Sequence, residues 1–241
     1  MIVDKTGFET LEVIKKAGNF NKWMFSEIET YCEGNILEIG SGIGNISQFF
    51  INKKIPLTLS DVDNDYINIL QTRFINSPEV KAIFSIDLQA DSFNRVYGDL
   101  CGNYDTIFML NVLEHLEDAN AAIKNCHYLI KPGGTLIVLV PAYTWLYSRM
   151  DSELGHKTRY TAGKIKTLIS EQEFTITKTF YFNAIGIIAW LYGKVMRLKK
   201  IASGEMSLFD RLVGAGKIID KLLFNKTGLS VICVAHKSNK Q

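Results

Sequence analysis

The sequence lacks the patterns that mark several classes of protein. Its cysteines are few, scattered and without a CxxC pair, which argues against both a zinc site and a disulfide framework: Cys32, Cys101, Cys126 and Cys233. Basic and acidic residues nearly balance, at 27 against 25, so bulk charge gives no reason to expect a nucleic-acid partner. No apolar run reaches the roughly 18 residues of a membrane span, and the first residues lack the apolar core of a signal peptide. We therefore expect a reduced, cytoplasmic protein with at most peripheral membrane contact.

The most informative segment that is present runs from Asn35 to Asn45, NILEIGSGIGN. A short apolar run over residues 36–39 predicts a buried strand, and an apolar-periodic segment that begins at Ile46 predicts a helix. Three glycines separate the two. Glycines at such a turn permit backbone conformations that a Cβ would block, and they let a ligand lie against bare main chain near a helix N-terminus.

The spacing of these glycines indicates which ligand fits. The dinucleotide fingerprint GxGxxG requires a third glycine three residues after the second, but Asn45 occupies that position and the glycine comes one residue early, at Gly44. Glu38, two residues before the first glycine, would repel a pyrophosphate but could accept from an ammonium group. The segment therefore disfavours NAD and favours a ligand with an adenosine and a cationic amino-acid end.

An acidic residue followed by GxGxG resembles the first motif of the class I S-adenosylmethionine-dependent methyltransferases. The passage YDTIFMLNVLEHLED, residues 104–118, closely resembles the segment around the end of the fourth strand in small-molecule members of that family. The resemblance implies S-adenosyl-L-methionine as the cofactor. It also implies a Rossmann-like, doubly wound α/β fold with a seven-stranded sheet, mostly parallel, whose last strand is antiparallel.

An acidic residue that ends the second predicted strand, residues 55–60, is expected to hold the ribose hydroxyls. Asp61 lies 17 residues after Gly44, close to the spacing of about 20 in doubly wound folds, and a carboxylate can accept from both hydroxyls of a diol. Asp63 is the rival by register. We favour Asp61 because the apolar run ends immediately before it, whereas Asp63 and Asn64 are typical of a helix N-cap.

The third predicted strand, residues 80–86, is followed by Asp87 and Leu88. By resemblance, an acid here accepts from the adenine amino group and the apolar side chain packs on the ring. Asp99 competes because Gly-Asp is the commoner spelling, but only five residues separate it from Asp105 in the next strand. The complete set of expected cofactor contacts is Glu38, Gly40, Ser41, Gly42, Gly44, Asn45, Asp61, Val62, Asp87, Leu88, Asn111 and Val112.

The passage after the fifth predicted strand, residues 141–161, crowds aromatic and charged residues into a loop, where substrate contacts commonly lie. It resembles LY..D...GH.RRY, a pattern of a methyltransferase subgroup often encoded beside glycosyltransferases, although only Arg159 of the paired arginines remains. We expect His156 to act as general base, and a structural role that ties the loop to the sheet stays open. Tyr147, Arg159 and Tyr160 are the expected substrate contacts, with an Asp151–Arg159 pair as an alternative.

A metal is not expected. Some related enzymes bind a divalent cation through ExxEH, but here Asn111 stands where the first Glu should be, and a neutral amide is a weaker ligand for a hard cation.

The chain is expected to form one domain over residues 1–241, with a helical N-terminal cap at 1–33 and a helical insertion at 183–228. The insertion reads as two helices, 184–200 and 208–224. It could lie on a membrane, line the entrance for a lipid-linked substrate, or serve as a lid or dimer contact packed on the sheet.

These features predict methyl transfer to a small acceptor, most simply the hydroxyl of a sugar, lipid-linked sugar, quinone or polyketide. Two rival hypotheses are a catalytically silent subunit that binds a partner and a dehydrogenase on the same scaffold. The intact Glu38, Asp61 and glycines oppose the first, and the glycine spacing opposes the second. The oligomeric state is not encoded in any pattern that we recognise.

Overall fold

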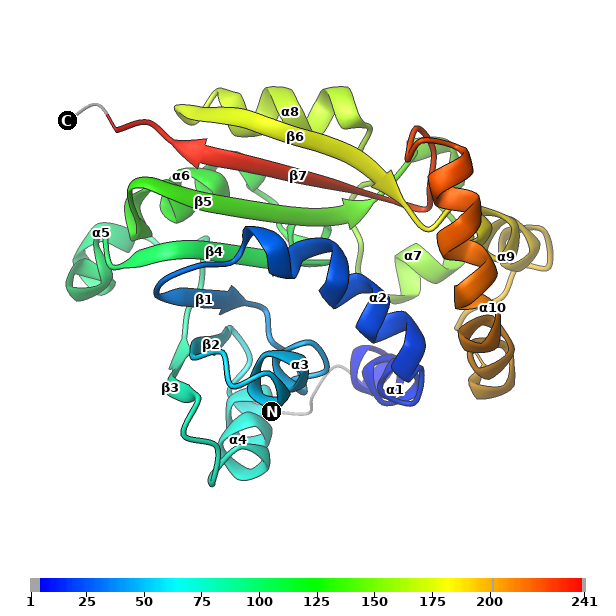
Figure 1. Cartoon of the computed structure of the whole chain (residues 1–241), viewed down its shortest axis with the longest axis horizontal. Helices are drawn as coiled ribbons and strands as arrows, with labels where there is room; N and C mark the ends of the chain where they lie inside the picture. Colours follow the sequence, from blue (N-terminus) through cyan, green and yellow to red (C-terminus); the bar gives the residue numbers. More distant parts are fainter. Residues whose placement is uncertain (1–4, 201, 240–241) are drawn as a thin grey trace.

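A computed structural model describes residues 5–200 and 202–239 as a seven-stranded sheet of order β3-β2-β1-β4-β5-β7-β6. Neighbouring strands pair in parallel from β3 to β5, and β7 runs antiparallel to both β5 and β6 (Figure 1). The predicted doubly wound fold with an antiparallel last strand is confirmed.

The strands are β1 (Ile36–Ile39), β2 (Leu57–Asp61), β3 (Val80–Ser85), β4 (Tyr104–Leu110), β5 (Ile130–Pro141), β6 (Phe174–Phe182) and β7 (Ser230–Lys237). The α-helices are α1 (Lys5–Lys15), α2 (Gly18–Ile28), α3 (Ser47–Asn52), α4 (Asn64–Arg73), α5 (Phe93–Val96), α6 (Ala119–Leu129), α7 (Arg149–Glu153), α8 (Ala162–Ser170), α9 (Ala184–Val195) and α10 (Ser203–Leu222). Short 3₁₀ turns are η1 (Glu29–Tyr31), η2 (Gly98–Leu100), η3 (Leu113–His115) and η4 (Thr144–Leu146).

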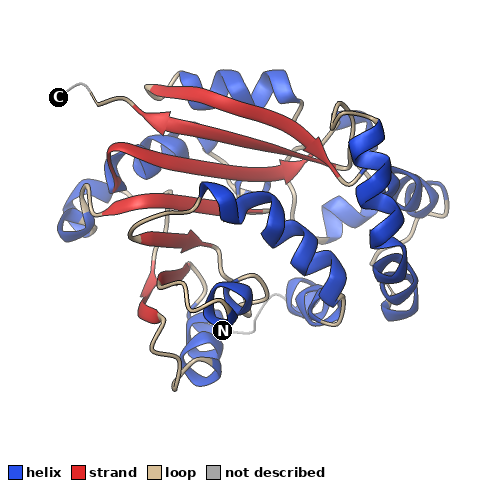
Figure 2. Cartoon of the chain, in the orientation of Figure 1, coloured by secondary structure: helices blue, strands red, loops and turns tan. Residues whose placement is uncertain are grey.

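Helices cover both faces of the sheet (Figure 2). Successive strand residues point to opposite faces, so in β4 Ile107 and Met109 pack with α5, α6 and α8, while Phe108 packs with α2, α3 and α4. Val213 of α10 joins the second of these two cores. Because each buried strand contributes to both cores, the strands read as near-continuous apolar runs.

The fifth strand begins earlier than the sequence predicts. The residues KPGG at 131–134 are typical of a turn that would start the strand at Thr135, but β5 begins at Ile130. Its pairing with β4 jumps from Tyr104–Ile130 to Thr106–Thr135, so the KPGG residues form a bulge within the strand. Gly133 takes φ +78° in this bulge, a left-handed conformation that glycine adopts without strain.

The N-terminal helices pack against the body of the protein. Trp23 is fully buried with its ring edge on Phe182, and Phe20 contacts Phe182 and Phe209, so both aromatic residues serve the core. Of the predicted cap at 1–33, residues 1–4 lie outside the described residues. Among those that are described, no helix combines the length and the apolarity needed to cross a bilayer.

Candidate active site

The glycine turn lies at the carboxyl end of β1, between β1 and α3. Gly40, Gly42 and Gly44 have φ values of +70°, +53° and +79°, conformations that side-chain-bearing residues rarely adopt. A Cβ on Gly40 would lie 2.4 Å from Val112 Cγ2, and one on Gly42 would lie 2.9 Å from Leu11 Cδ1. The turn is therefore held tightly between the segment after β4 and helix α1, and its glycines are required by both conformation and space.

Glu38 is the most deeply buried of the acids at this turn. Its side chain accepts a 2.5 Å hydrogen bond from the Ser47 hydroxyl, at the first turn of α3. Burial raises the pKa of Glu38 to about 7, although the hydrogen bonds from Ser47 and Ser41 oppose that shift. The sequence did not single out Ser47, because a serine that begins a short helix is usually a cap. The Glu38–Ser47 bond fixes the start of α3 against β1.

Asp61, the last residue of β2, also reaches the glycine turn. Its Oδ2 accepts from the Gly42 N–H at 2.8 Å and its Oδ1 accepts from the Asp63 N–H at 3.1 Å. Each carboxylate oxygen has a second lone pair for a ligand hydroxyl. Burial raises the pKa of Asp61, and the two backbone N–H groups counter it. Asp63 instead caps α4 by accepting from the Asp65 N–H at 2.8 Å, as its position predicted.

The remaining expected cofactor residues follow the carboxyl ends of β2, β3 and β4. Val62 is largely exposed beside Asp61. Asp87 is partly exposed while Leu88 is buried, and the rival Asp99 lies in η2, shortly before the amino end of β4. Asn111 is exposed at φ +55°, directly after β4. Asn45 donates to the Leu11 carbonyl at 3.0 Å, so it attaches α1 to the turn.

A second cluster comes from the loop after β5. The His156 Nδ1 lies 2.9 Å from Asp151 Oδ1, and Arg159 Nε donates to the same oxygen at 2.7 Å. Burial raises the pKa of Asp151, but the bonds from His156 and Arg159 outweigh it and leave the pKa below its usual value. Since a carboxylate only accepts, the imidazole proton lies on Nδ1 and Nε2 is left as the basic nitrogen.

The expected substrate residues of this loop are less accessible than predicted. Arg159 is buried, pairs with Asp151, donates to the Ala142 carbonyl at 3.1 Å and stacks on Trp190 at 4.5 Å. The Asp151–Arg159 pair that we kept as an alternative is therefore present. Tyr160 is also buried, which raises its pKa to about 12. Tyr147 donates to the His156 carbonyl at 2.7 Å, so it helps to shape the loop.

Glu114 and His115, in η3 after β4, lie against this loop. The His115 and His156 rings are 4.7 Å apart, edge to face. Glu114 is fully buried and neither of its carboxylate oxygens has a hydrogen-bond partner among the described residues. Burial raises the pKa of Glu114 to about 8, so the side chain is mostly neutral at pH 7. The sequence named Glu114 only as part of an incomplete metal motif, and its buried state carried no sequence signal.

Glu114, His115 and His156 also offer ligand atoms that all lie within 4.8 Å of one another. A carboxylate and two imidazoles form a plausible donor set for a divalent transition metal. The expectation of no metal stays a prediction.

We expect the charge state of Glu114 to govern stability at high pH. The folded protein holds this proton up to about pH 8, whereas an unfolded glutamate releases it near 4.5. Between these two pH values the folded state binds more protons than the unfolded state. The contribution of Glu114 to the free energy of unfolding is therefore fully present below pH 4.5 and is lost as the pH rises through 8. Glu114→Gln should therefore match the wild type at pH 5 and exceed it at pH 9, by the order of a few kcal/mol.

Thermal melts of both proteins from pH 5 to pH 9 measure this difference. Glu38 also has a raised pKa, but it is present in both proteins, so its effect cancels in the difference between their stabilities. A Glu114→Gln variant that is less stable than the wild type at pH 9 would contradict the neutral state, and would point to an ionised Glu114 held by a cation.

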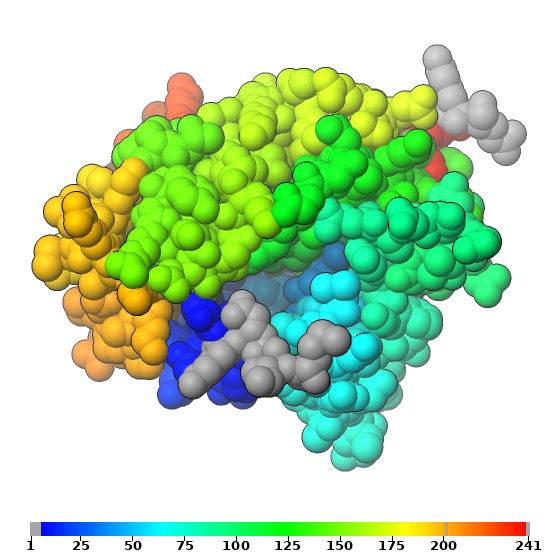
Figure 3. Space-filling model, turned by 180° about the vertical axis from the view of Figure 1, so that it is seen from behind, coloured from blue at the N-terminus to red at the C-terminus, as the bar shows by residue number. Residues whose placement is uncertain are grey.

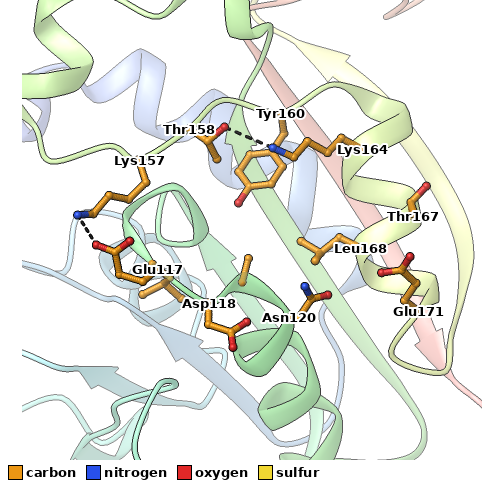
Figure 4. Close-up of a pocket in the computed structure, with 12 residues that line it drawn as sticks. Glu117, Asp118, Asn120, Lys157, Thr158, Tyr160, Lys164, Thr167, Leu168 and Glu171 are labelled. Atoms are coloured by element: carbon orange, nitrogen blue, oxygen red, sulfur yellow. Dashed lines mark hydrogen bonds and ion pairs between the residues drawn. The ribbon is translucent and has the colours of Figure 1, made fainter.

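The surface is hollowed at the carboxyl edge of the sheet. Figure 3 shows, from behind, a recess between the yellow-green surface near residues 150–160 and the cyan surface near residues 60–70. A separate open cavity of about 550 Å³ lies between residues 116–118, the start of α6, residues 157–160 and α8. Figure 4 shows that Lys157 and Glu117 pair across one side of it and that Lys164 and Glu171 line the other. Its wall includes Tyr160, so it adjoins the His156 loop, but it lies away from the glycine turn.

Comparison with known proteins agrees with this geometry. Residues 37–136 match a family described as "Methyltransferase domain". The chain is 30% identical over 125 residues to a lovastatin diketide synthase of Monascus pilosus, covering 47% of this chain and 5% of that protein. It is 25% identical over 103 residues to a ubiquinone biosynthesis O-methyltransferase of Xanthomonas euvesicatoria, covering 43% of this chain and 41% of that protein. The chain thus spans less than half the length of these relatives.

Solved structures share the fold over almost the whole chain. Phosphoethanolamine N-methyltransferase 2 of Haemonchus contortus, in complex with S-adenosyl-L-methionine, superposes with a TM-score of 0.59 at 14% identity and covers 91% of this chain and 52% of that one. At that identity the likeness shows the fold alone.

Proposed function

We propose that this chain is a class I S-adenosylmethionine-dependent methyltransferase that transfers the cofactor's methyl group to a hydroxyl of a small acceptor, with His156 as the general base. The observation that carries the proposal is the Asp151–His156 pair, which stands beside η3 at the carboxyl edge of the sheet, where the glycine turn and Asp61 also lie.

The residues at this edge suit the proposed cofactor. When bound, S-adenosylmethionine supplies a methyl group already activated on a sulfonium. The glycine turn offers bare main chain beside Asp61 for the methionine part, and the free lone pairs of Asp61 suit the ribose diol. Asp87 would accept from the adenine amino group with Leu88 against the ring, and Asn111 would face the sulfonium side.

Glu38 has a narrower role in this proposal than its position suggested. It is buried and bonded to Ser47, so it would act on the methionine ammonium through the turn that it supports or through a water molecule. Its side chain is a positioning group for the glycine turn.

His156 would take the acceptor proton on Nε2 while Asp151 holds Nδ1–H. The Asp151 carboxylate fixes the tautomer and stabilises the imidazolium that forms. Arg159 donates to the same carboxylate oxygen and holds it in position. In-line displacement needs little more from the protein than orientation and proton removal. A relative named as an O-methyltransferase supports an oxygen acceptor, and a sugar, a lipid-linked sugar, a quinone and a polyketide are the classes to screen.

The experiment is an acceptor screen that follows radiolabelled methyl groups from S-adenosylmethionine into product. Turnover by the wild type identifies the acceptor, and NMR of the purified product shows whether the methyl group is bonded to oxygen, nitrogen or carbon. A product methylated on nitrogen or carbon would overturn the proposal of hydroxyl transfer.

A further inference from the structure

Helices α9 and α10 expose an unusual amount of apolar surface. Twelve of the seventeen exposed large apolar side chains in the described part of the chain fall within residues 183–228. Soluble monomers rarely leave contiguous patches of this kind uncovered, and such patches mark sites of interaction.

In α9 these side chains form one stripe. Ile188, Leu191, Tyr192, Val195 and Met196 are all exposed, and their spacing of three and four residues places them on a single face. The opposite side of α9 packs on the body of the protein, where Gly186 and Gly193 are buried.

In α10 the apolar side chains that recur at helical spacing also face outward. The sequence places Leu208, Leu212, Ala215, Ile219 and Leu222 at helical spacing, and all five are exposed. The residues that α10 buries are Met206, Val213, Gly216 and Asp220. This stripe therefore does not pack on the sheet of its own chain, and it is presented to whatever lies outside. We call these two stripes together the outer face.

Charge separates this segment from the rest of the molecule. Residues 183–228 contain eight lysines and arginines against three acids, whereas the remainder of the chain has 19 basic and 22 acidic residues. The three acids are used internally: Asp210 accepts from the Phe20 N–H, Asp220 from the Asn183 N–H, and Glu205 from the Ala202 N–H. Six of the eight basic residues are exposed, so the segment presents net positive charge around its apolar stripes.

Apolar stripes on helices, flanked by lysine and arginine, are the chemistry of a surface that binds an anionic bilayer in plane. A second copy of the chain fits less well. A symmetric dimer through the outer face would set the exposed basic residues of one copy against those of the other, and its acids are already occupied.

The outer face is also joined to the proposed active site. Figure 1 shows α9 and α10 at the end of the molecule toward which β1, β4 and β5 point. Trp190 of α9 stacks on Arg159, and Lys194 donates to the Trp145 carbonyl, so α9 rests directly on the loop that carries His156. A bilayer on this face would lie beside the proposed active site.

We propose that α9 and α10 form a docking surface for an anionic lipid bilayer, which brings the cleft to acceptors that reside in or on the membrane. The docking itself does not rest on the proposed methyl transfer, because vesicle binding is measured without acceptor or cofactor.

The test is co-sedimentation of the full chain with vesicles. We expect it to pellet with vesicles of equal parts phosphatidylcholine and phosphatidylglycerol and to stay in solution with phosphatidylcholine alone. Ile188→Ser, Val195→Ser and Leu222→Ser combined should weaken partitioning at least about tenfold. Arg197→Gln, Lys199→Gln and Lys221→Gln combined should weaken it by about fivefold for each charge removed, and added salt should act in the same direction.

A matched control distinguishes docking from general stickiness. Ile75 and Val96 are exposed apolar residues outside the insertion, at 78% and 58%, and Ile75→Ser with Val96→Ser should leave binding unchanged. Circular dichroism confirms that each variant is folded. The proposal is overturned if the folded wild type fails to pellet with anionic vesicles at low salt, or if the control weakens binding as much as the outer-face variants. Sedimentation velocity that shows a dimer abolished by the apolar variant would assign the face to a second copy instead.

Discussion

Replacing Gly40 with alanine is expected to weaken S-adenosylmethionine binding by more than about a hundredfold. The new Cβ would meet Val112 Cγ2 at 2.4 Å, far inside normal contact, and alanine disfavours φ +70°. Because the valine is branched at Cβ, it has little freedom to move aside, so the turn itself must shift. Calorimetric titration of the folded variant with the cofactor measures the loss.

Gly102 supplies the matched control for this change. It also has a left-handed φ, +57°, but a Cβ there would meet nothing within 4 Å, and the residue precedes the amino end of β4. Gly102→Ala therefore carries the same backbone strain without disturbing the glycine turn, and it should bind the cofactor as the wild type does. Equal affinities for Gly40→Ala and wild type would show that the cofactor lies elsewhere.

Replacing His156 with alanine is expected to lower turnover by about 10²- to 10⁴-fold while cofactor affinity stays unchanged. The side chain would supply proton removal, and Asp151 keeps its bonds to Arg159 and Ser148 in the variant. Added imidazole should restore part of the activity by occupying the vacated space. Initial rates with the acceptor found in the screen, with and without imidazole, measure both effects.

His127→Ala is the control, since that imidazole lies on α6, packs against Phe174 and is remote from the loop. A purely structural His156 would give a different pattern: a lower melting temperature, weaker acceptor binding and no response to imidazole. That pattern would leave orientation alone as the contribution of the protein.

The sequence was sufficient for those features in which one short segment determines its own conformation. The glycines after β1 could be assigned to a tight turn because their spacing admits few backbone paths, and Asp63 could be assigned to a cap because it directly precedes α4. The sheet followed from the family resemblance, and the alternation of apolar runs with helical segments is also typical of parallel strands, which require crossover helices between them.

Features that depend on contacts between distant segments could not be predicted from the sequence. Glu114 is buried without partners only because the residue 149–160 loop folds over it, and Arg159 is internal because α9 places Trp190 on it. The apolar period of α10 was visible, but its direction was not. A period shows that one face is apolar, whereas Asp210 and Asp220, which attach α10 by its polar side, determine which face is outward.

The most direct test of the central claim is calorimetric titration of the purified chain with S-adenosylmethionine and S-adenosylhomocysteine, alongside Asp61→Ala and Asp63→Ala. We predict micromolar binding by the wild type, retained in Asp63→Ala at a cost of about 1 kcal/mol in folding stability from the lost cap, and lost in folded Asp61→Ala. Absence of binding by the folded wild type would contradict the account.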